Sequence, residues 1–116
     1  MEENIEQFLK EFKLKMDIWD IVFIDNRPKN TQTLADLEIT SVKRKTIIKE
    51  LVVADYSEGP MDDVVFMGSP LWVFGKEVKA KEIYIKLSMG FAGRQVLCIS
   101  FHVAEYPMNY PYNQRR

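Results

Sequence analysis

The apolar and polar residues of this chain follow two periods, one in its first half and one in its second. From Glu3 to Met16 the apolar residues recur every three or four positions, which is the period of one face of an amphipathic helix. From Ile83 to Met89 they recur at every second position, which is typical of a strand with one buried face. The pattern therefore predicts helices followed by strands, and hence an α+β fold.

The first half predicts a long helix, a short strand and further helices. The long helix is expected to bury one stripe of apolar residues, namely Ile5, Phe8, Leu9, Phe12 and Met16. Ile18–Ile24 is short and rich in β-branched and aromatic residues, so we interpret it as a strand or an extended segment. Residues 25–30 contain Asn and Pro and predict a turn.

Two capped helices are expected next. A threonine at position 31 or 33 is a candidate cap for a short helix over Leu34–Glu38. Val42–Leu51 predicts a firmer helix with Thr40 or Ser41 as its N-cap. Its inner side is expected to hold Val42, Ile48, Leu51 and the aliphatic stem of Lys45. The basic run at 43–45 is interpreted as a solvated helix face.

The second half predicts a loop, three strands and an extended tail. Ala54–Pro70 is rich in Gly, Pro and Asp and predicts a loop. Leu71–Val78 predicts a strand, and Lys81–Glu105 predicts a β-hairpin with a glycine-bearing turn. The two prolines of Tyr106–Tyr112 exclude a strand interior or a helix, so this segment is expected to lie extended across the surface. We thus expect an antiparallel sheet of about four to six strands with two or three helices packed on one face.

One face of the predicted hairpin collects polar side chains. Tyr84 and Lys86 alternate with apolar residues on the first strand, and Ser100 and His102 lie two apart on the second. This face is where we expect function. Arg94 lies at the turn, and Lys76 lies on the preceding strand on the same side as Trp72. Trp72 suits either stacking on a nucleic-acid base or filling the gap between sheet and helix.

Length and composition narrow the class of protein. The 116 residues predict one domain, 1–116, with 47% apolar and 28% charged residues. No apolar run approaches the ~20 residues that a membrane helix needs, and the acidic start is unlike a signal peptide. Cys98 is the single cysteine, which excludes an internal disulfide. We expect a cytoplasmic protein without a metal or cofactor and without membrane contact.

The small net charge of −1 conceals an asymmetry. Residues 1–71 carry 9 Lys or Arg and 14 Asp or Glu, whereas residues 72–116 carry 7 and 3. The positive half contains the predicted sheet, and a positive sheet attracts phosphate groups. The pI near 5.9 of the whole chain is low for a nucleic-acid-binding protein.

Several segments resemble a known family when their order and spacing are taken together. They are TLADLEIT, the helix after it, the Asp55-Tyr56 step, LWVFGKEV, EIYIKL and CISFH. In this respect the chain resembles the motility quorum-sensing regulator (MqsR) toxins of bacterial type II toxin–antitoxin systems, within the RelE/ParE-like toxin fold. The resemblance covers about Thr33 to Glu105. It implies a RelE/MqsR-like fold, a cognate antitoxin as partner, and messenger RNA, free or on the ribosome, as substrate.

The resemblance also implies roles for individual residues. Tyr84 stands at the position of the family's catalytic tyrosine, with Lys86 two residues on, and His102 stands where the family has a lysine. Such toxins are metal-independent endoribonucleases (mRNA interferases), and we expect Tyr84 and His102 to transfer protons here. We expect the substrate to be held by Lys76, Lys86, Arg94 and Trp72.

A second function from a different class stays open. Ser57 and Glu58 stand where the family has a lysine, and Val73 stands where it has a glutamine. These departures favour a non-catalytic toxin-like protein that binds a protein partner, either an antitoxin or, in the ParE manner, gyrase. The mildly acidic pI favours it as well.

Overall fold

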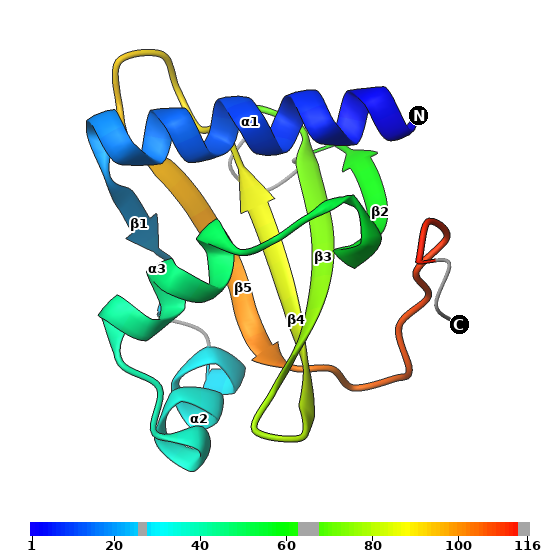
Figure 1. Ribbon diagram of the computed structural model, residues 1–116. Helices are drawn as coiled ribbons and strands as arrows, with labels where there is room; N and C mark the ends of the chain where they lie inside the picture. Colours follow the sequence, from blue (N-terminus) through cyan, green and yellow to red (C-terminus); the bar gives the residue numbers. More distant parts are fainter. Residues whose placement is uncertain (26–27, 63–67, 114–116) are drawn as a thin grey trace.

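The computed structural model describes residues 1–25, 28–62 and 68–113. Within these ranges the chain forms three α-helices, one 3₁₀ turn and five strands (Figure 1). In chain order they are α1 (Glu2–Trp19), β1 (Ile21–Phe23), α2 (Pro28–Leu37), α3 (Ser41–Lys49), η1 (Val53–Asp55), β2 (Tyr56–Met61), β3 (Leu71–Val78), β4 (Lys81–Ser88) and β5 (Val96–Val103). The strands make one sheet in the order β1-β5-β4-β3-β2. The predicted α+β class is confirmed.

The sheet is mixed, whereas the sequence predicted a purely antiparallel one. Strands β2 to β5 pair antiparallel, as expected for consecutive strands of a meander. β1 instead runs parallel to β5, with Ile21 opposite Val96 and Phe23 opposite Cys98. This pairing joins the two segments that lie farthest apart along the chain among the strands.

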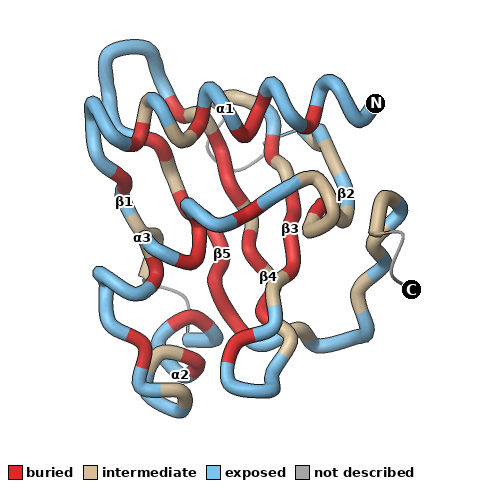
Figure 2. Tube along the Cα trace, viewed as in Figure 1, coloured by how far each residue is buried: buried red, intermediate tan, exposed pale blue. Residues whose placement is uncertain are grey.

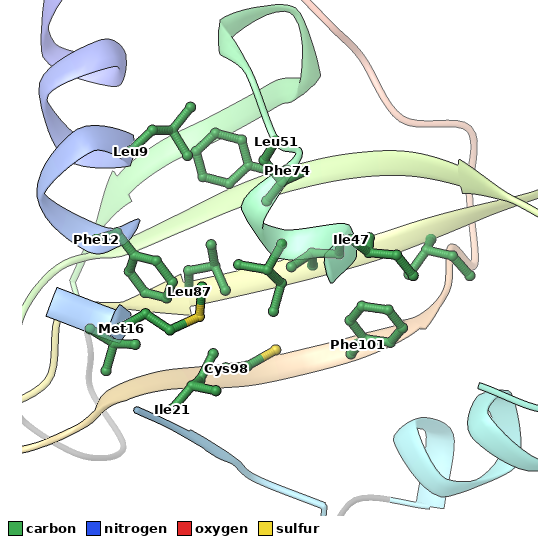
Figure 3. Packing of buried hydrophobic residues seen from close by; sticks show 14 of the residues in the cluster. Leu9, Phe12, Met16, Ile21, Ile47, Leu51, Phe74, Leu87, Cys98 and Phe101 are labelled. Carbon is green, nitrogen blue, oxygen red and sulfur yellow. The ribbon is translucent and has the colours of Figure 1, made fainter. Parts of the chain in front are cut away.

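Helices α1 and α3 cover one face of the sheet, which we call the helix-side face (Figure 1). The apolar stripe predicted for α1 is buried at all five positions. It packs against alternate residues of the central strands, among them Phe74, Ile85 and Phe101, which are fully buried (Figures 2 and 3). Most of the hydrophobic core therefore lies between these helices and the sheet.

A β-bulge in β5 changes which residues of this strand face the helices. Leu87 pairs with Cys98 and Lys86 pairs with Ser100, so Ile99 is an extra residue between them. Before the bulge Cys98 shares the helix-side face, and after it Phe101 does. The bulge thus leaves Ser100 and His102 together on the opposite face.

Helix α2 is longer than predicted and lies beside β5 past the end of β1. It begins at Pro28, because proline at the first helical position has no N–H to lose. The Asn30 side-chain oxygen accepts from the Phe101 N–H (3.1 Å), and the Thr33 hydroxyl accepts from the Val103 N–H (2.9 Å). Both side chains are buried. They satisfy N–H groups of β5 that β1 is too short to reach.

The inner face of α3 differs from the prediction. Thr40 caps the helix as expected and accepts from the Lys43 N–H (3.1 Å). Val42, however, is 75% exposed, and Arg44 is only 4% exposed. The helix buries positions 44, 47 and 48, so Arg44 points inward, where it makes a two-fold hydrogen bond to Asp25 (2.7 and 3.0 Å). Its guanidinium also lies 3.7 Å from the centre of the Phe23 ring.

Two further expectations were wrong. The predicted strand Ile18–Ile24 is shorter, because α1 continues through Trp19. The predicted loop Ala54–Pro70 contains β2, which pairs with β3 through two register shifts. An irregular strand at a sheet edge tolerates Gly and Pro, which is why the sequence suggested a loop. Residues 63–67 of that loop lie outside the described residues.

Candidate functional site

Tyr84 and His102 lie side by side on the face of the sheet opposite the helices. They are register partners on β4 and β5, and their rings stack with centroids 5.1 Å apart at 12°. The alternation of the hairpin predicted that both would leave the sheet on the same side. The register adds that they are direct neighbours, since cross-strand partners have Cβ atoms about 4.5–5.5 Å apart.

Lys86 and Ser100 form the next cross-strand pair of the same face. The Lys86 Nζ lies 5.9 Å from the centre of the Tyr84 ring, and Ser100 is 1% exposed. These four side chains form the floor of a groove of about 690 Å³. A phenol, an ammonium group, a hydroxyl and an imidazole therefore share one concave surface.

The hydrogen bond of His102 defines the chemistry of its ring. Nδ1 lies 2.9 Å from the carbonyl oxygen of Val103. A carbonyl only accepts, so in this arrangement Nδ1 carries the proton and donates it. In the neutral ring Nε2 is then the nitrogen with the lone pair, and it is the atom able to accept a proton from a substrate.

An ion pair between two distant segments forms one side of the groove. Lys29, at the start of α2, binds the carboxylate of Glu105, just after β5, and both residues line the groove. The hydrogen bond from Lys29 holds the pKa of Glu105 below its ordinary value of 4.5. Sequence reasoning missed this pair, because 76 positions separate the two residues and neither has a local pattern that marks it.

The C-terminal residues 104–113, which we call the tail, pack on this face, which we therefore call the tail-side face. Glu82 of β4 accepts hydrogen bonds from the Met108 N–H (3.1 Å) and from the Tyr110 hydroxyl (2.6 Å). At Gly75 of β3 a Cβ atom would collide with the Tyr110 phenol, so only glycine fits beneath this ring. The extended tail predicted from its prolines is thus fixed to the sheet, and its first half is a wall of the groove.

Two of the predicted substrate-binding residues, Trp72 and Lys76, lie on the helix-side face. Trp72 and Lys76 are each two residues from Phe74 on β3, so their side chains point to the same face as Phe74. Trp72 stacks on Phe8 of α1 with centroids 4.7 Å apart, which is the gap-filling role that the sequence also allowed. Lys76 pairs with Asp55 of η1 (3.2 Å). The sheet separates both side chains from the groove.

Arg94 is also remote from Tyr84 and His102. It lies in the turn between β4 and β5, whereas His102 lies near the far end of β5 (Figure 1). The stretch of β5 between Val96 and His102 alone spans about 20 Å at ~3.3 Å per residue. Of the six predicted site residues, the structure brings together Tyr84, Lys86 and His102.

The charges of the groove are mixed. Lys29, Lys86 and His102 supply the positive or protonatable groups, and Glu58 and Glu105 supply carboxylates. In residues 1–25, 28–62 and 68–113, no three His, Cys, Asp or Glu side chains gather as a metal site. Over the same residues, no helix has both the length and the apolar character needed to cross a bilayer.

Comparison with known proteins found no relative of this chain. No protein-family profile, curated protein or solved structure matches the chain. The chemistry of the groove is therefore the basis for a functional assignment.

Proposed function

We propose that this chain is the toxin of a bacterial type II toxin–antitoxin pair and that it is a metal-independent endoribonuclease. The observation that carries the proposal is the stacked pair of Tyr84 and His102 beside Lys86 in one groove. General acid–base groups next to a cation are what cleavage of a phosphodiester by its own 2′-hydroxyl requires. The MqsR resemblance supports the same reaction.

Each group has a role in this reaction. The Nε2 atom of His102 accepts the proton of the 2′-hydroxyl, whose oxygen then attacks the adjacent phosphorus. The Lys86 ammonium stabilises the charge that develops on the phosphoryl oxygens. The bond from phosphorus to the 5′-oxygen breaks, and Tyr84 donates a proton to that leaving oxygen. The products are a 2′,3′-cyclic phosphate and a free 5′-hydroxyl.

Lys29 replaces the more distant lysine and arginine that the sequence suggested for phosphate binding. It lies at the rim of the groove, where its charge is shared with Glu105. An extended RNA strand crossing the groove would meet Lys29 and Lys86 in turn. We place this activity in the cytoplasm, with messenger RNA, free or on the ribosome, as substrate and a cognate antitoxin as inhibitor.

Cleavage of purified RNA in the presence of EDTA tests the proposal. We expect wild type to cleave and His102→Ala and Tyr84→Phe to lose about 10²-fold or more in kcat, the usual contribution of a general acid or base. Lys86→Ala should lose activity as well, whereas Arg94→Ala, a matched loss of one cation outside the groove, should not. Equal cleavage by wild type and the folded His102 and Tyr84 variants would overturn the proposal.

A second candidate function is binding of a protein partner without catalysis. It is favoured by three large apolar side chains near the end of α1, Leu14, Ile18 and Trp19, which are 59%, 66% and 48% exposed. Exposed apolar side chains of this size are typical of protein-binding surfaces. Wild type that arrests growth but leaves RNA intact, while Leu14→Asp relieves the arrest, would favour this function over the first.

A further inference from the structure

Tyr106 is the most exposed large apolar side chain among the described residues, although it lines the groove. It is 80% exposed, whereas Tyr84, across the groove floor, is half-buried. An aromatic ring left in water at the rim of a concave site forgoes the free energy that its burial would release. A ligand that covers the ring recovers that free energy.

The backbone around Tyr106 is fixed on both sides. One residue before it, Glu105 is bound to Lys29 of α2. Two residues after it, the Met108 N–H donates to Glu82. Glu82 also accepts from the Tyr110 hydroxyl, and the Tyr110 ring lies over Gly75. The Glu82–Tyr110 contact thus acts as a latch that sets where the ring lies. A ring placed in this way binds a planar partner with little loss of conformational entropy.

The groups near Tyr106 indicate which planar partner fits. The groove combines an aromatic rim with the cations Lys29 and Lys86 on one concave surface. A nucleotide has the same combination, a flat base joined to a phosphate, and unpaired bases stack on aromatic side chains. In double-stranded RNA the bases are already paired and stacked on one another, so they are not available to stack on Tyr106.

We propose that Tyr106 stacks on an unpaired base of the RNA substrate and that the latch of Glu82 and Tyr110 positions it. This inference rests on the proposed ribonuclease function, and it adds a binding residue and its support to the groove. Tyr106 touches the base and takes no part in the proton transfers. Its loss weakens binding, raising KM with kcat preserved.

Binding of short 2′-O-methyl oligonucleotides tests the inference without cleavage, since the attacking hydroxyl is blocked. We expect Tyr106→Ala to raise the Kd of a fluorescent oligo(A) about tenfold, the order of effect of losing one base–aromatic stack. Tyr106→Phe keeps the ring and should bind like wild type. The preference for oligo(A) over oligo(U) should shrink in Tyr106→Ala, because purines stack more extensively.

The latch is tested by a readout that does not involve RNA. Tyr110→Phe removes the hydroxyl that binds Glu82, and we expect faster hydrogen exchange at the Met108 amide together with a higher Kd. Tyr112→Phe, the matched loss of a hydroxyl two residues on, should change neither. Met108 exchange that is the same in both variants would overturn the latch.

The outcomes separate the two proposals. Wild type that binds oligonucleotide with the same Kd as Tyr106→Ala would overturn this inference and leave the ribonuclease function standing. Wild type that neither binds nor cleaves single-stranded RNA would overturn the proposed function, and the base-stacking role with it.

Discussion

The two faces of the sheet are built from the same strands but are covered in different ways. On the helix-side face, Phe74, Ile85 and Phe101 are sealed beneath two helices. On the tail-side face, the alternate residues Tyr84 and His102 line a groove that the extended tail borders. A helix presents a continuous apolar stripe, and an extended segment does not. One face therefore supplies the core, and the other keeps a groove.

This difference shows how one strand serves stability and chemistry at once. Phe101 and His102 are adjacent in sequence, yet one is fully buried in the core and the other lines the groove. The alternation of strand side chains separates the two roles by a single residue. Changes on one face should therefore leave the other largely intact, and the following predictions test that separation.

The largest expected effect is the loss of Phe101 from the helix-side face. Phe101→Ala should lower the free energy of unfolding by about 3–5 kcal/mol, because a fully buried ring is replaced by a cavity. His102→Ala, its neighbour on the tail-side face, should cost less, about 1–2 kcal/mol, which is the loss of one ring stack and one hydrogen bond. Urea denaturation measures both. Equal losses would show that the two faces do not differ in their contribution to stability.

The next effect concerns the tail. Gly75→Ala places a methyl group against the Tyr110 phenol, and such overpacking costs about 1–3 kcal/mol. In a Tyr110→Ala background the same substitution should cost almost nothing, because the opposing ring is gone. A double-mutant cycle measures this coupling. If the costs of Gly75→Ala and Tyr110→Ala are additive, the cost of Gly75→Ala does not come from contact with the Tyr110 ring.

A pH-dependent effect is expected from Cys98 on the helix-side face. Burial raises its pKa from 9.0 to about 12. Between these values the unfolded chain loses the thiol proton and the folded chain keeps it. Stability from this group is thus complete below pH 9 and falls by about 1.4 kcal/mol per unit as pH rises above it. Between pH 8 and pH 10 the free energy of unfolding, measured by denaturation, should fall less steeply for Cys98→Ala than for wild type. Equal slopes for the two proteins would contradict the prediction.

The smallest effect is expected at the rim of the groove. The Lys29 hydrogen bond holds the pKa of Glu105 below 4.5. Lys29→Ala should return that pKa to its ordinary value, whereas Lys29→Arg should keep it low. A carboxyl titration followed by NMR measures the shift. The melting temperature should stay unchanged, since exposed ion pairs contribute little to stability.

Regular periods made part of the fold predictable. The apolar stripe of α1 and the alternation of β4 are local patterns, and both are confirmed by burial. Strand β2 was missed because its Gly and Pro indicate a loop unless the neighbouring strand is known. The burial of Arg44 was not predicted because its partner, Asp25, lies 19 residues away. Such contacts depend on the fold and have no local pattern.

The candidate site was predictable only in part for the same reason. Alternation placed Tyr84 and His102 on one side of the hairpin, and the register then made them neighbours. It also grouped Trp72 with Lys76, but which side of the sheet they would share depends on β3 pairing with β4. Lys29 and Glu105 join the groove, and Glu82 binds the tail, through segments that meet only after folding.

The hydrogen bonds from Asn30 and Thr33 to β5 have a consequence for assembly. A strand margin with unused amides is a template on which a second molecule can add its own backbone, and repeated addition leads to fibres. Here two short side chains of a helix occupy those donors, and a helix offers no ladder to copy. This stretch of β5, past the end of β1, is closed to growth, so polymers of the protein would have to begin elsewhere.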